Sequence, residues 1–304
     1  MKRLLFFCLM ILVLLSSVLT VSAQDTKAPD DEEYWVEWAL AGSDLNGEPW
    51  RPGIDADTDL FINSWEGAPT KVTHGTLLER DILTKGDPID PPAKGAVLKH
   101  ASGFTHATLP MGRSTDETTL RGKQEVLYIL TGAGTITAGS VTAELKSGIV
   151  VLIPEGRSFS ITNTTDEALT FYIIHDPVPD GFKPNRDILV KDENRIPVNE
   201  VGYHWTHIAK GVLSPSDGLA TVHYVLTVEQ PPMTIGHPHS HNEDFEEVWT
   251  GIRGTSIAFL GKKIQNQPPG TAYMIPPDDK TPHCNINLTE EPAKLLYFST
   301  RFDL

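Results

Sequence analysis

Short runs of β-branched and aromatic residues, separated by glycine and proline, recur along most of the chain. The clearest of them cover residues 125–130, 148–153, 224–228, 256–260 and 294–299. Runs of this length, bounded by turn residues, are typical of β-strands. No helical periodicity longer than two turns follows the apolar N-terminal segment. Many short strands with frequent turns predict an all-β protein built as a sandwich or barrel.

The second half of the chain repeats the first. Five turn and strand motifs recur at a constant offset of 122 residues: Pro110-Met111 with Pro232-Met233, Gln124-Glu125-Val126 with Glu246-Glu247-Val248, Gly132 with Gly254, Gly148 with Gly270 and Pro154 with Pro276. A two-residue insertion then changes the offset to 124, which pairs Phe159 with His283 and Asn163 with Asn287. A constant offset without gaps indicates two copies of one module.

Composition divides the chain into five parts. Residues 1–23 are apolar, and residues 24–95 form an irregular N-terminal arm that begins polar and acidic. The first module is expected over residues 96–176 and the second over residues 200–304. The segment 177–199 between them is rich in Pro, Asp and Asn, which predicts a linker.

The first 23 residues have the pattern of a secretory signal peptide. Lys2 and Arg3 precede an apolar run over residues 4–15, and the small residues Val21-Ser22-Ala23 predict cleavage after Ala23. The apolar run is short for a membrane span and lacks a stop-transfer flank. We therefore expect an exported protein, periplasmic or secreted, that has no membrane association after cleavage.

The charge balance limits the partners of the mature protein. The full chain has 25 basic and 40 acidic residues, and losing Lys2 and Arg3 changes its net charge from −15 to −17. Such an acidic surface argues against nucleic acid and anionic membranes as partners and leaves a small-molecule substrate as the expected one. Of the two cysteines, Cys8 lies in the signal, so Cys284 cannot form an intramolecular disulfide.

The candidate chemistry lies in the second module. His237, His239 and His241 alternate along the chain, Glu246 and Glu247 follow them, and His283 comes later, after a stretch rich in Gly and Pro. Side chains at positions i and i+2 of a strand share a face, so His239 and His241 can meet at one point. Imidazole and carboxylate together suit a divalent transition metal better than calcium or magnesium.

These residues resemble the two motifs of the cupin superfamily. His239-x-His241, a glutamate and Gly254 correspond to the first motif, and Gly270, Pro276, His283 and Asn287 to the second. The spacing departs from the family pattern in two places: Glu247 lies one residue farther from His241 than usual, and two extra residues occur around positions 277–280. The resemblance implies two tandem jelly-roll β-barrels and a metal held by His239, His241, Glu247 (or Glu246) and His283.

The repeat favours Glu247 over Glu246 as the carboxylate ligand. Glu125 and Glu247 both lie seven residues before a turn glycine, and strand register is firmer than loop length. Glu246 would then face the opposite side of the strand, as a solvated or supporting carboxylate. Trp249 shares the parity of Glu247, so it either lines the metal pocket or belongs to the ordinary barrel core.

The first module lacks most of the ligand set. Glu117 and Thr119 stand at the positions of His239 and His241, and Phe159 replaces His283, so that only Glu125 remains. A lone carboxylate binds transition metals poorly, and we expect a metal-free first barrel that pairs with the second.

The bicupins that this chain resembles include oxalate decarboxylases and oxidases, flavonol dioxygenases and ureidoglycine aminohydrolases. We therefore expect an enzyme with one divalent transition metal per chain, manganese or iron preferred over nickel, zinc or copper, that acts on an organic acid or a sugar derivative. The candidate catalytic residues are Tyr273, Lys280 and Arg253.

Two other functions are compatible with the same residues. One is a non-catalytic barrel that binds a sugar or metabolite around a structural metal, and the other is metal storage that uses His237. A homodimer is possible by analogy with the family. Four tryptophans in the arm could stack on a sugar ring, but packing of the arm onto a barrel is the favoured interpretation: Trp35, Trp38, Trp50 and Trp65.

Overall fold

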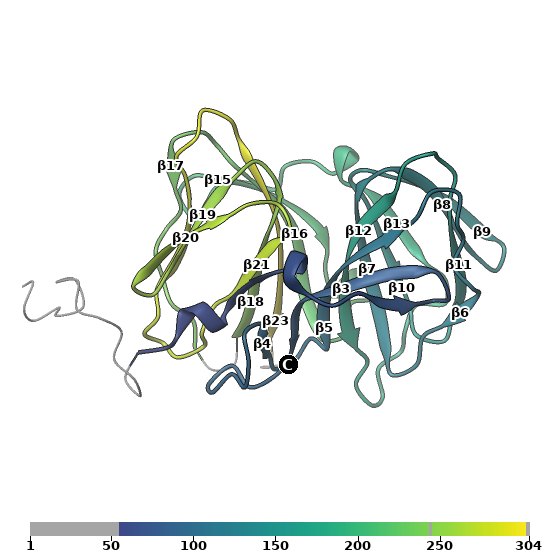
Figure 1. The fold of residues 1–304 in the computed structure, drawn as a ribbon, viewed down its shortest axis with the longest axis horizontal. Helices are drawn as coiled ribbons and strands as arrows, with labels where there is room; N and C mark the ends of the chain where they lie inside the picture. The colour runs from purple at the N-terminus through teal and green to yellow at the C-terminus, as the bar shows by residue number, and fades with distance from the viewer. Residues whose placement is uncertain (1–54, 243–244, 302–304) are drawn as a thin grey trace, which may run out of the picture. The chain divides into compact units, whose positions relative to one another are not determined.

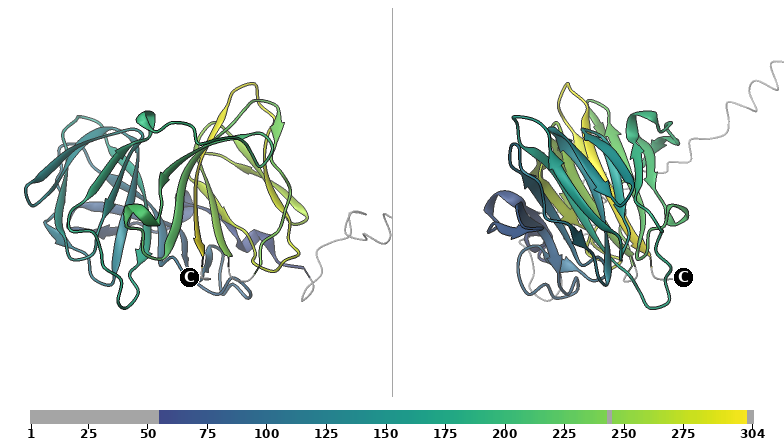
Figure 2. Two further views of the ribbon diagram at one scale, coloured as in Figure 1. Left: turned by 180° about the vertical axis from the view of Figure 1, so that it is seen from behind. Right: turned by 90° about the vertical axis from the view of Figure 1, so that its right-hand side faces the viewer.

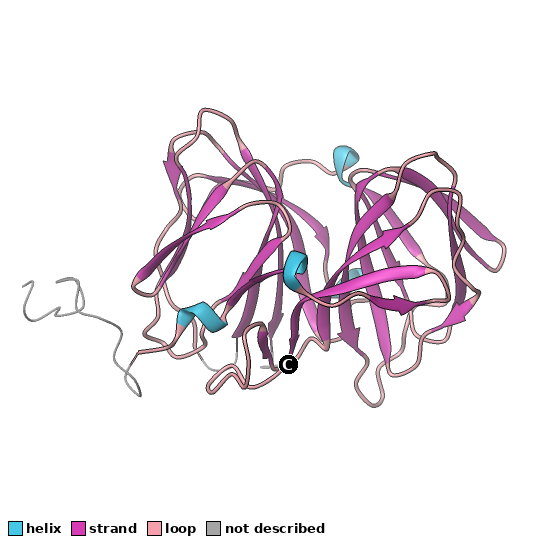
Figure 3. Ribbon diagram, in the orientation of Figure 1, coloured by secondary structure: helices cyan, strands magenta, loops and turns pink. Residues whose placement is uncertain are grey.

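The computed structural model describes residues 55–242 and 245–301 of the 304-residue chain. The described residues belong to one compact unit, in which two β-barrels lie side by side (Figures 1 and 2). Nearly all regular structure in it is β-strand, interrupted by short 3₁₀ turns (Figure 3). No helix among these residues is long and apolar enough to span a membrane. The predicted signal peptide lies outside the described residues.

The first barrel consists of a large sheet and a four-stranded sheet. The large sheet has the order β13-β10-β7-β12-β5-β3-β2 with β4 beside β3, and the small sheet has the order β6-β11-β8-β9. The strands are β2 (Lys71–Thr73), β3 (Leu77–Lys85), β4 (Ala96–Leu98), β5 (Gly103–Leu109), β6 (Thr118–Thr119), β7 (Lys123–Thr131), β8 (Ala133–Ala138), β9 (Val141–Lys146), β10 (Ile149–Ile153), β11 (Ser158–Asn163), β12 (Leu169–Pro177) and β13 (Leu189–Asp192).

The second barrel repeats this plan. Its seven-stranded sheet has the order β1-β21-β18-β23-β16-β15-β14, and its small sheet has the order β17-β22-β19-β20. The strands are β1 (Ile62–Ser64), β14 (Glu200–Tyr203), β15 (His207–Leu213), β16 (Val222–Gln230), β17 (Thr234–Ile235), β18 (Phe245–Arg253), β19 (Ser256–Leu260), β20 (Lys263–Gln267), β21 (Thr271–Met274), β22 (His283–Asn287) and β23 (Ala293–Arg301). The expected fold class, two tandem jelly-roll barrels, is thus confirmed.

Each barrel's large sheet receives a strand from the segment that precedes the other barrel. β1 comes before the first barrel in the sequence but pairs with β21 of the second. β13 lies in the predicted linker and pairs with β10 of the first. The first barrel also begins earlier than residue 96, because β2 and β3 belong to its sheet. Three successive charged residues at positions 79–81, of which Glu79 is buried, conceal the alternation by which a strand is recognised from sequence.

A continuous apolar core joins the barrels. The ring centroids of Phe104 in the first barrel and Phe298 in the second are 5.3 Å apart. The buried hydroxyl of Tyr172 donates a hydrogen bond of 2.6 Å to the carbonyl of Gly251 across the same interface. A second apolar cluster fills the interior of the first barrel. The two large sheets are therefore buried on both faces where they meet, which places the polar sites inside the barrels.

Of the four tryptophans in the predicted arm, Trp65 lies within the described residues. Its ring stacks on His106 with centroids 4.4 Å apart, and the guanidinium carbon of Arg80 lies 5.2 Å from the centroid of the Trp65 ring. These contacts are packing contacts between the arm and the first barrel. They agree with the packing interpretation for this residue.

Candidate metal centre

Three histidines and one glutamate meet inside the second barrel. His239 and His241 lie in the segment between β17 and β18, Glu247 lies on β18, and His283 begins β22. Two backbone hydrogen bonds join His239 to His283, N to O at 3.2 Å and 2.8 Å. The small sheet and the large sheet thereby present their ligands toward each other.

The donor atoms are close enough for one ion. The Nε2 atom of His283 lies 3.3 Å from Nε2 of His239 and 3.2 Å from Nε2 of His241. The carboxylate oxygens of Glu247 lie 3.3 Å from Nε2 of His241 and 3.4 Å from Nε2 of His283. Ligands at about 2.0–2.2 Å from a metal are separated by distances of this size. The four residues therefore fit a transition-metal ion.

The ring orientations also suit coordination. The ring planes of His239 and His241 are inclined by 83°, those of His239 and His283 by 54°, and those of His241 and His283 by 39°. An imidazole lone pair lies in its ring plane, so inclined planes can share a point. A second group, His204, His237 and His239, is equally close, but its rings are stacked at 10–15°. Nearly parallel planes share no such point, and we assign no metal to that group.

Hydrogen bonds direct the Nε2 lone pairs inward. Nδ1 of His239 donates to the carbonyl of His237 at 2.9 Å. Tyr273 donates its hydroxyl proton to Asn285 at 3.1 Å, which leaves its oxygen to accept from Nδ1 of His283 at 3.4 Å. Both Nε2 atoms are then unprotonated and face each other, an arrangement that a cation stabilises. Burial lowers the pKa of both His239 and His283, which favours the neutral, metal-binding form.

The carboxylate of Glu247 is fixed on both oxygens. It accepts hydrogen bonds from Trp249 Nε1 at 2.6 Å and from the Tyr297 hydroxyl at 3.1 Å. Burial by itself would raise the pKa of Glu247, but the hydrogen bond with His241 and the neighbouring imidazoles lower it well below its ordinary value. Trp249 therefore lines the centre, and the glutamate is ionised there.

The two extra residues before His283 belong to a loop that supports His241. The Asp279 amide donates to the His241 carbonyl at 2.9 Å, and Asp279 adopts a left-handed φ of 59°. The Asp278 carboxylate accepts hydrogen bonds from the Lys280 amide at 3.0 Å and from the Thr281 amide at 2.7 Å. The insertion is absorbed in a turn, so the register of His283 is kept.

Glu246 faces away from the centre. Its carboxylate accepts hydrogen bonds from the backbone amides of Lys99, His100 and Ala101 at 2.7–3.0 Å, and only 1% of the residue is exposed. The expectation of a solvated carboxylate is wrong, because the outer face of β18 packs against the first barrel. Glu246 instead joins the two barrels.

The three candidate catalytic residues have different positions. Tyr273 is fully buried and contacts His283 through its hydroxyl. Arg253 pairs with Glu229 at 3.2 Å on the surface, with 61% of its side chain exposed. Lys280 is exposed in the loop that supports His241. Only Tyr273 contacts a residue of the proposed metal centre in the described structure.

Two histidines near the centre were missed in the sequence. The ring of His204 stacks on His239 with centroids 4.6 Å apart, and the ring of His207 lies 5.6 Å from that of Trp249. A second, shorter repeat could have revealed His204: Thr73-His74-Gly75-Thr76 matches Tyr203-His204-Trp205-Thr206. It gives no signal for His207, because Leu77 stands at the matching position. His74 and His204 both adopt a left-handed backbone, with φ of 46° and 45°.

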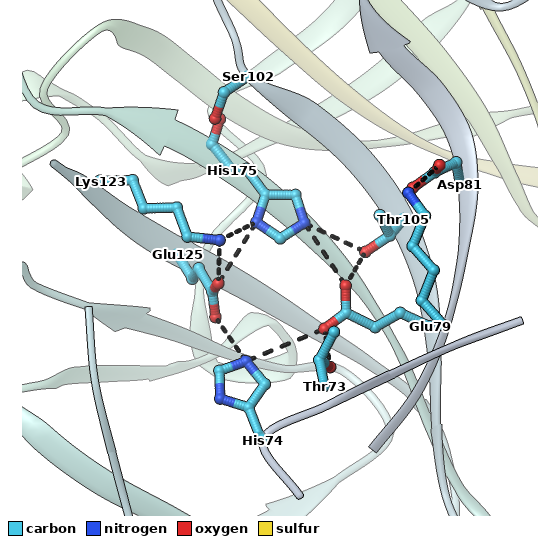
Figure 4. A network of polar contacts seen from close by, with 10 residues as sticks. Thr73, His74, Glu79, Asp81, Ser102, Thr105, Lys123, Glu125 and His175 are labelled. Atoms are coloured by element: carbon cyan, nitrogen blue, oxygen red, sulfur yellow. Dashed lines mark hydrogen bonds and ion pairs between the residues drawn. The ribbon is translucent and has the colours of Figure 1, made fainter. Parts of the chain in front are cut away.

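In the part of the chain that the structure describes, the first barrel has no group of three histidines equivalent to His239, His241 and His283. Thr118 on β6 lies opposite Phe159 on β11, as His239 lies opposite His283 in the second barrel. Thr118 therefore matches His239, and not Glu117, which the sequence offset predicted. Glu125 is ionised here too: burial would raise its pKa, but the hydrogen bonds and charges of His175 and Lys123 lower it to about 2. Lys123 Nζ lies 2.8 Å from the carboxylate (Figure 4).

In sequence, the chain matches no family model and none of the curated proteins. In structure it is similar to AerE from Microcystis aeruginosa, with 11% identity and a TM-score of 0.60 over 80% of this chain and 100% of that one. It is also similar to YlbA from E. coli, with 14% identity and a TM-score of 0.60 over 86% and 97% of the two chains. A third is Bacillus subtilis oxalate decarboxylase, described with Mn(II) centres, with 11% identity and a TM-score of 0.59 over 82% and 79%. At these identities the likeness establishes the fold, and the chain has the jelly-roll architecture of the cupins.

Proposed function

We propose that this protein is an exported, metal-dependent enzyme that acts on a small oxygenated molecule, such as an organic acid or a sugar derivative. The observation that carries the proposal is the convergence of His239, His241, Glu247 and His283 on one point in the second barrel. The preferred metal is manganese or iron, and the Mn(II) centres of the similar oxalate decarboxylase support manganese.

The ligand set leaves room for chemistry. Structural zinc sites close at four ligands, whereas a five- or six-coordinate metal with four protein ligands retains one or two open positions. A bound divalent metal would polarise a substrate carboxylate or carbonyl, or acidify a water molecule. His239, His241 and His283 would supply neutral nitrogens and Glu247 a negative charge, so the centre keeps a net positive charge for an anionic substrate.

The surrounding side chains keep this arrangement fixed. Tyr273 orients His283, and Trp249 and Tyr297 orient Glu247. Side-chain exposure is 2% for His283 and Glu247 but 17% for His241. Substrate would therefore reach the centre from the side of His239 and His241, which are both partly exposed.

Metal analysis of the purified chain tests this proposal. We expect about one equivalent of a divalent transition metal per chain by elemental analysis, and its loss in a His241→Ala variant. His223→Ala removes an imidazole that packs on Tyr224 instead, and should keep the metal. Full metal content in His241→Ala would contradict the assigned centre.

Activity separates the enzyme from the alternative, a non-catalytic binding protein with a structural metal. A screen of the metal-loaded protein against small carboxylic acids and uronates should reveal turnover that chelation abolishes. The thermal unfolding transition should survive chelation in an enzyme whose barrels are stabilised by their apolar cores. Collapse of that transition without any turnover would favour the binding protein.

A further inference from the structure

We infer that the second barrel contains a substrate subsite beside the metal centre, formed by His207 and Ser299, that takes an uncharged hydroxyl or carboxamide group of a small carboxylic acid. This inference rests on the proposed function of the same centre and specifies its substrate class. It comes from comparing the interiors of the two barrels at equivalent positions.

The strand registers define these equivalences. His175 lies opposite Glu125 in the first barrel, and Ser299 lies opposite Glu247 in the second. In the first barrel, Glu79 on β3 pairs with Ala107 on β5, which pairs with Phe171 on β12. In the second barrel, Ala209 on β15 pairs with Val228 on β16, which pairs with Leu295 on β23. In the β2–β3 hairpin of the first barrel, Leu77 pairs with Thr73 next to the turn. In the β14–β15 hairpin of the second barrel, His207 pairs with Tyr203 in the same place. The equivalent pairs are therefore His175 with Ser299, Glu79 with Ala209, and Leu77 with His207.

In the first barrel, side chains of the protein itself fill this space. Figure 4 shows His175 between two carboxylates, 3.8 Å from Glu79 through Nε2 and 3.3 Å from Glu125 through Nδ1. Lys123 approaches both Glu125 and His175, at 2.8 Å and 3.0 Å. The Glu79 carboxylate also lies 3.9 Å from Nε2 of His74. These polar groups contact one another, so the protein's own side chains occupy this part of the interior.

In the second barrel the same positions have small side chains. Ala209 stands in place of Glu79 and Ser299 in place of His175, so the volume of a carboxylate arm and an imidazole is not filled by these residues. His207 and Ser299 are each 1% exposed, and among the described residues neither ring nitrogen of His207 nor the Ser299 hydroxyl has a hydrogen-bond partner. Buried polar groups without partners are costly, so a water or a ligand is expected to meet them.

The close approach at Gly236 supports a fixed position for His207. A Cβ atom at Gly236 would lie 3.0 Å from Cε1 and 3.1 Å from Nε2 of the His207 ring. Burial lowers the pKa of His207 to about 4, so the imidazole is neutral and offers one donor and one acceptor. The serine hydroxyl likewise donates and accepts. Hydroxyl and carboxamide groups are the uncharged partners that complement both.

The charges around the subsite limit the substrate further. Lys123 and Phe245 occupy the same first position of β7 and β18, and Phe245 packs on His241 with ring centroids 4.6 Å apart. In the part of the chain that the structure describes, no lysine or arginine pairs with the four metal ligands, His207 or Ser299. A single carboxylate would therefore bind at the metal, and a second one would meet no positive charge.

Binding of two small acids to the manganese-loaded full chain tests the subsite. Glycerate carries hydroxyls that propionate lacks, and calorimetry should show that glycerate binds more tightly. Ser299→Ala and His207→Leu should each raise the Kd for glycerate by about threefold to tenfold, the loss of one neutral hydrogen bond. The Kd for propionate and the metal content should not change.

Thr300→Val is the matched control. Its hydroxyl is also buried and has no partner among the residues that the structure describes, but it lies on the opposite face of β23, where it pairs in register with Glu246. The control should leave both Kd values unchanged. Ala209→Glu, which places a carboxylate at the position of Glu79, should abolish glycerate binding while the metal is retained. Its unfolding temperature should fall, because the buried carboxylate meets no positive charge there.

Three results would overturn the subsite: equal affinity for the two acids, no binding of either acid by the metal-loaded protein, or unchanged glycerate affinity in both Ser299→Ala and His207→Leu. Failure of the proposed function is distinct, because it appears as missing metal or missing turnover. If the protein binds metal and turns over substrate, but neither Ser299 nor His207 affects glycerate binding, the subsite is refuted and the proposed function is not.

Discussion

Two adjacent glutamates on β18 are equally buried and have different tasks. Glu247 faces the barrel interior and its four polar neighbours, whereas Glu246 accepts three backbone amides of the first barrel. Asp176 does the reverse, accepting the amides of Ala220, Thr221 and Val222 from the second barrel. Alternation along a strand thus separates a ligand from a structural carboxylate over a single residue.

Substitution of these glutamates should separate metal content from stability. Glu246→Gln replaces one carboxylate oxygen, which accepts hydrogen bonds, by an NH2 group, which donates them. Because three backbone amides point at this side chain, the substitution should lower the free energy of unfolding by about 2–4 kcal/mol. Its metal content should equal that of the unaltered protein. Glu247→Gln should instead lose most of its metal.

Denaturant unfolding combined with elemental analysis distinguishes the two variants. The chelated protein is the reference for the unfolding measurement, so that metal binding does not contribute to the difference. Loss of metal in Glu246→Gln with an unchanged free energy of unfolding would show that the roles of the two residues are reversed.

At the scale of elements, the exchange of β1 and β13 joins the barrels. β1 adds to the edge of the second sheet and β13 to the edge of the first, although each precedes the other barrel in the chain. A strand that covers a sheet edge removes a site for aggregation, and here it also makes each barrel depend on the other. We therefore expect the described unit to unfold cooperatively.

Ile62 of β1 tests this dependence. It is 4% exposed, and Ile62→Ala should lower the free energy of unfolding by about 2–4 kcal/mol through a buried cavity. Val72 on the edge strand β2 is 65% exposed, and Val72→Ala should change the free energy of unfolding by less than about 0.5 kcal/mol. Both barrels should unfold in one transition in Ile62→Ala. Two separate transitions, followed by near-ultraviolet circular dichroism, would show that the barrels fold independently.

At the scale of the whole molecule, buried neutral histidines make stability depend on pH. Burial, and then the charge of Arg80, lowers the pKa of His106 to about 4, against an ordinary value of 6.5. The unfolded chain therefore takes up a proton before the folded one does. The contribution of His106 to the free energy of unfolding is fully present above about pH 6.5. It is lost as the pH falls toward 4, by an amount on the order of 2 kcal/mol.

His106→Phe should reduce this dependence. Phenylalanine can retain the stacking on Trp65 but cannot be protonated, so the free energy of unfolding of the variant should decline less between pH 6.5 and pH 4. Urea unfolding of the chelated protein at both pH values measures the difference. An equally steep decline in the variant would assign the acid sensitivity to other groups.

Much of this architecture can be predicted from the sequence because its signals are local or periodic. The turn glycines and prolines at constant offset define two modules, and the alternation of His239 and His241 places them on one face. The pairing of Glu247 with these histidines follows from strand register, which the pleat makes firm. The export of the protein and the identity of its metal stay predictions.

Tertiary structure decided what depends on contacts between distant residues. It placed Glu246 against the first barrel, exchanged β1 and β13, and brought His204 and His207 beside the centre. It also placed Glu79 and His175 in the interior of one barrel and the smaller Ala209 and Ser299 at the equivalent positions of the other. Apart from the short repeat around His204, no local pattern encodes these outcomes, because burial and partner choice arise only when strands far apart in the chain close into a barrel.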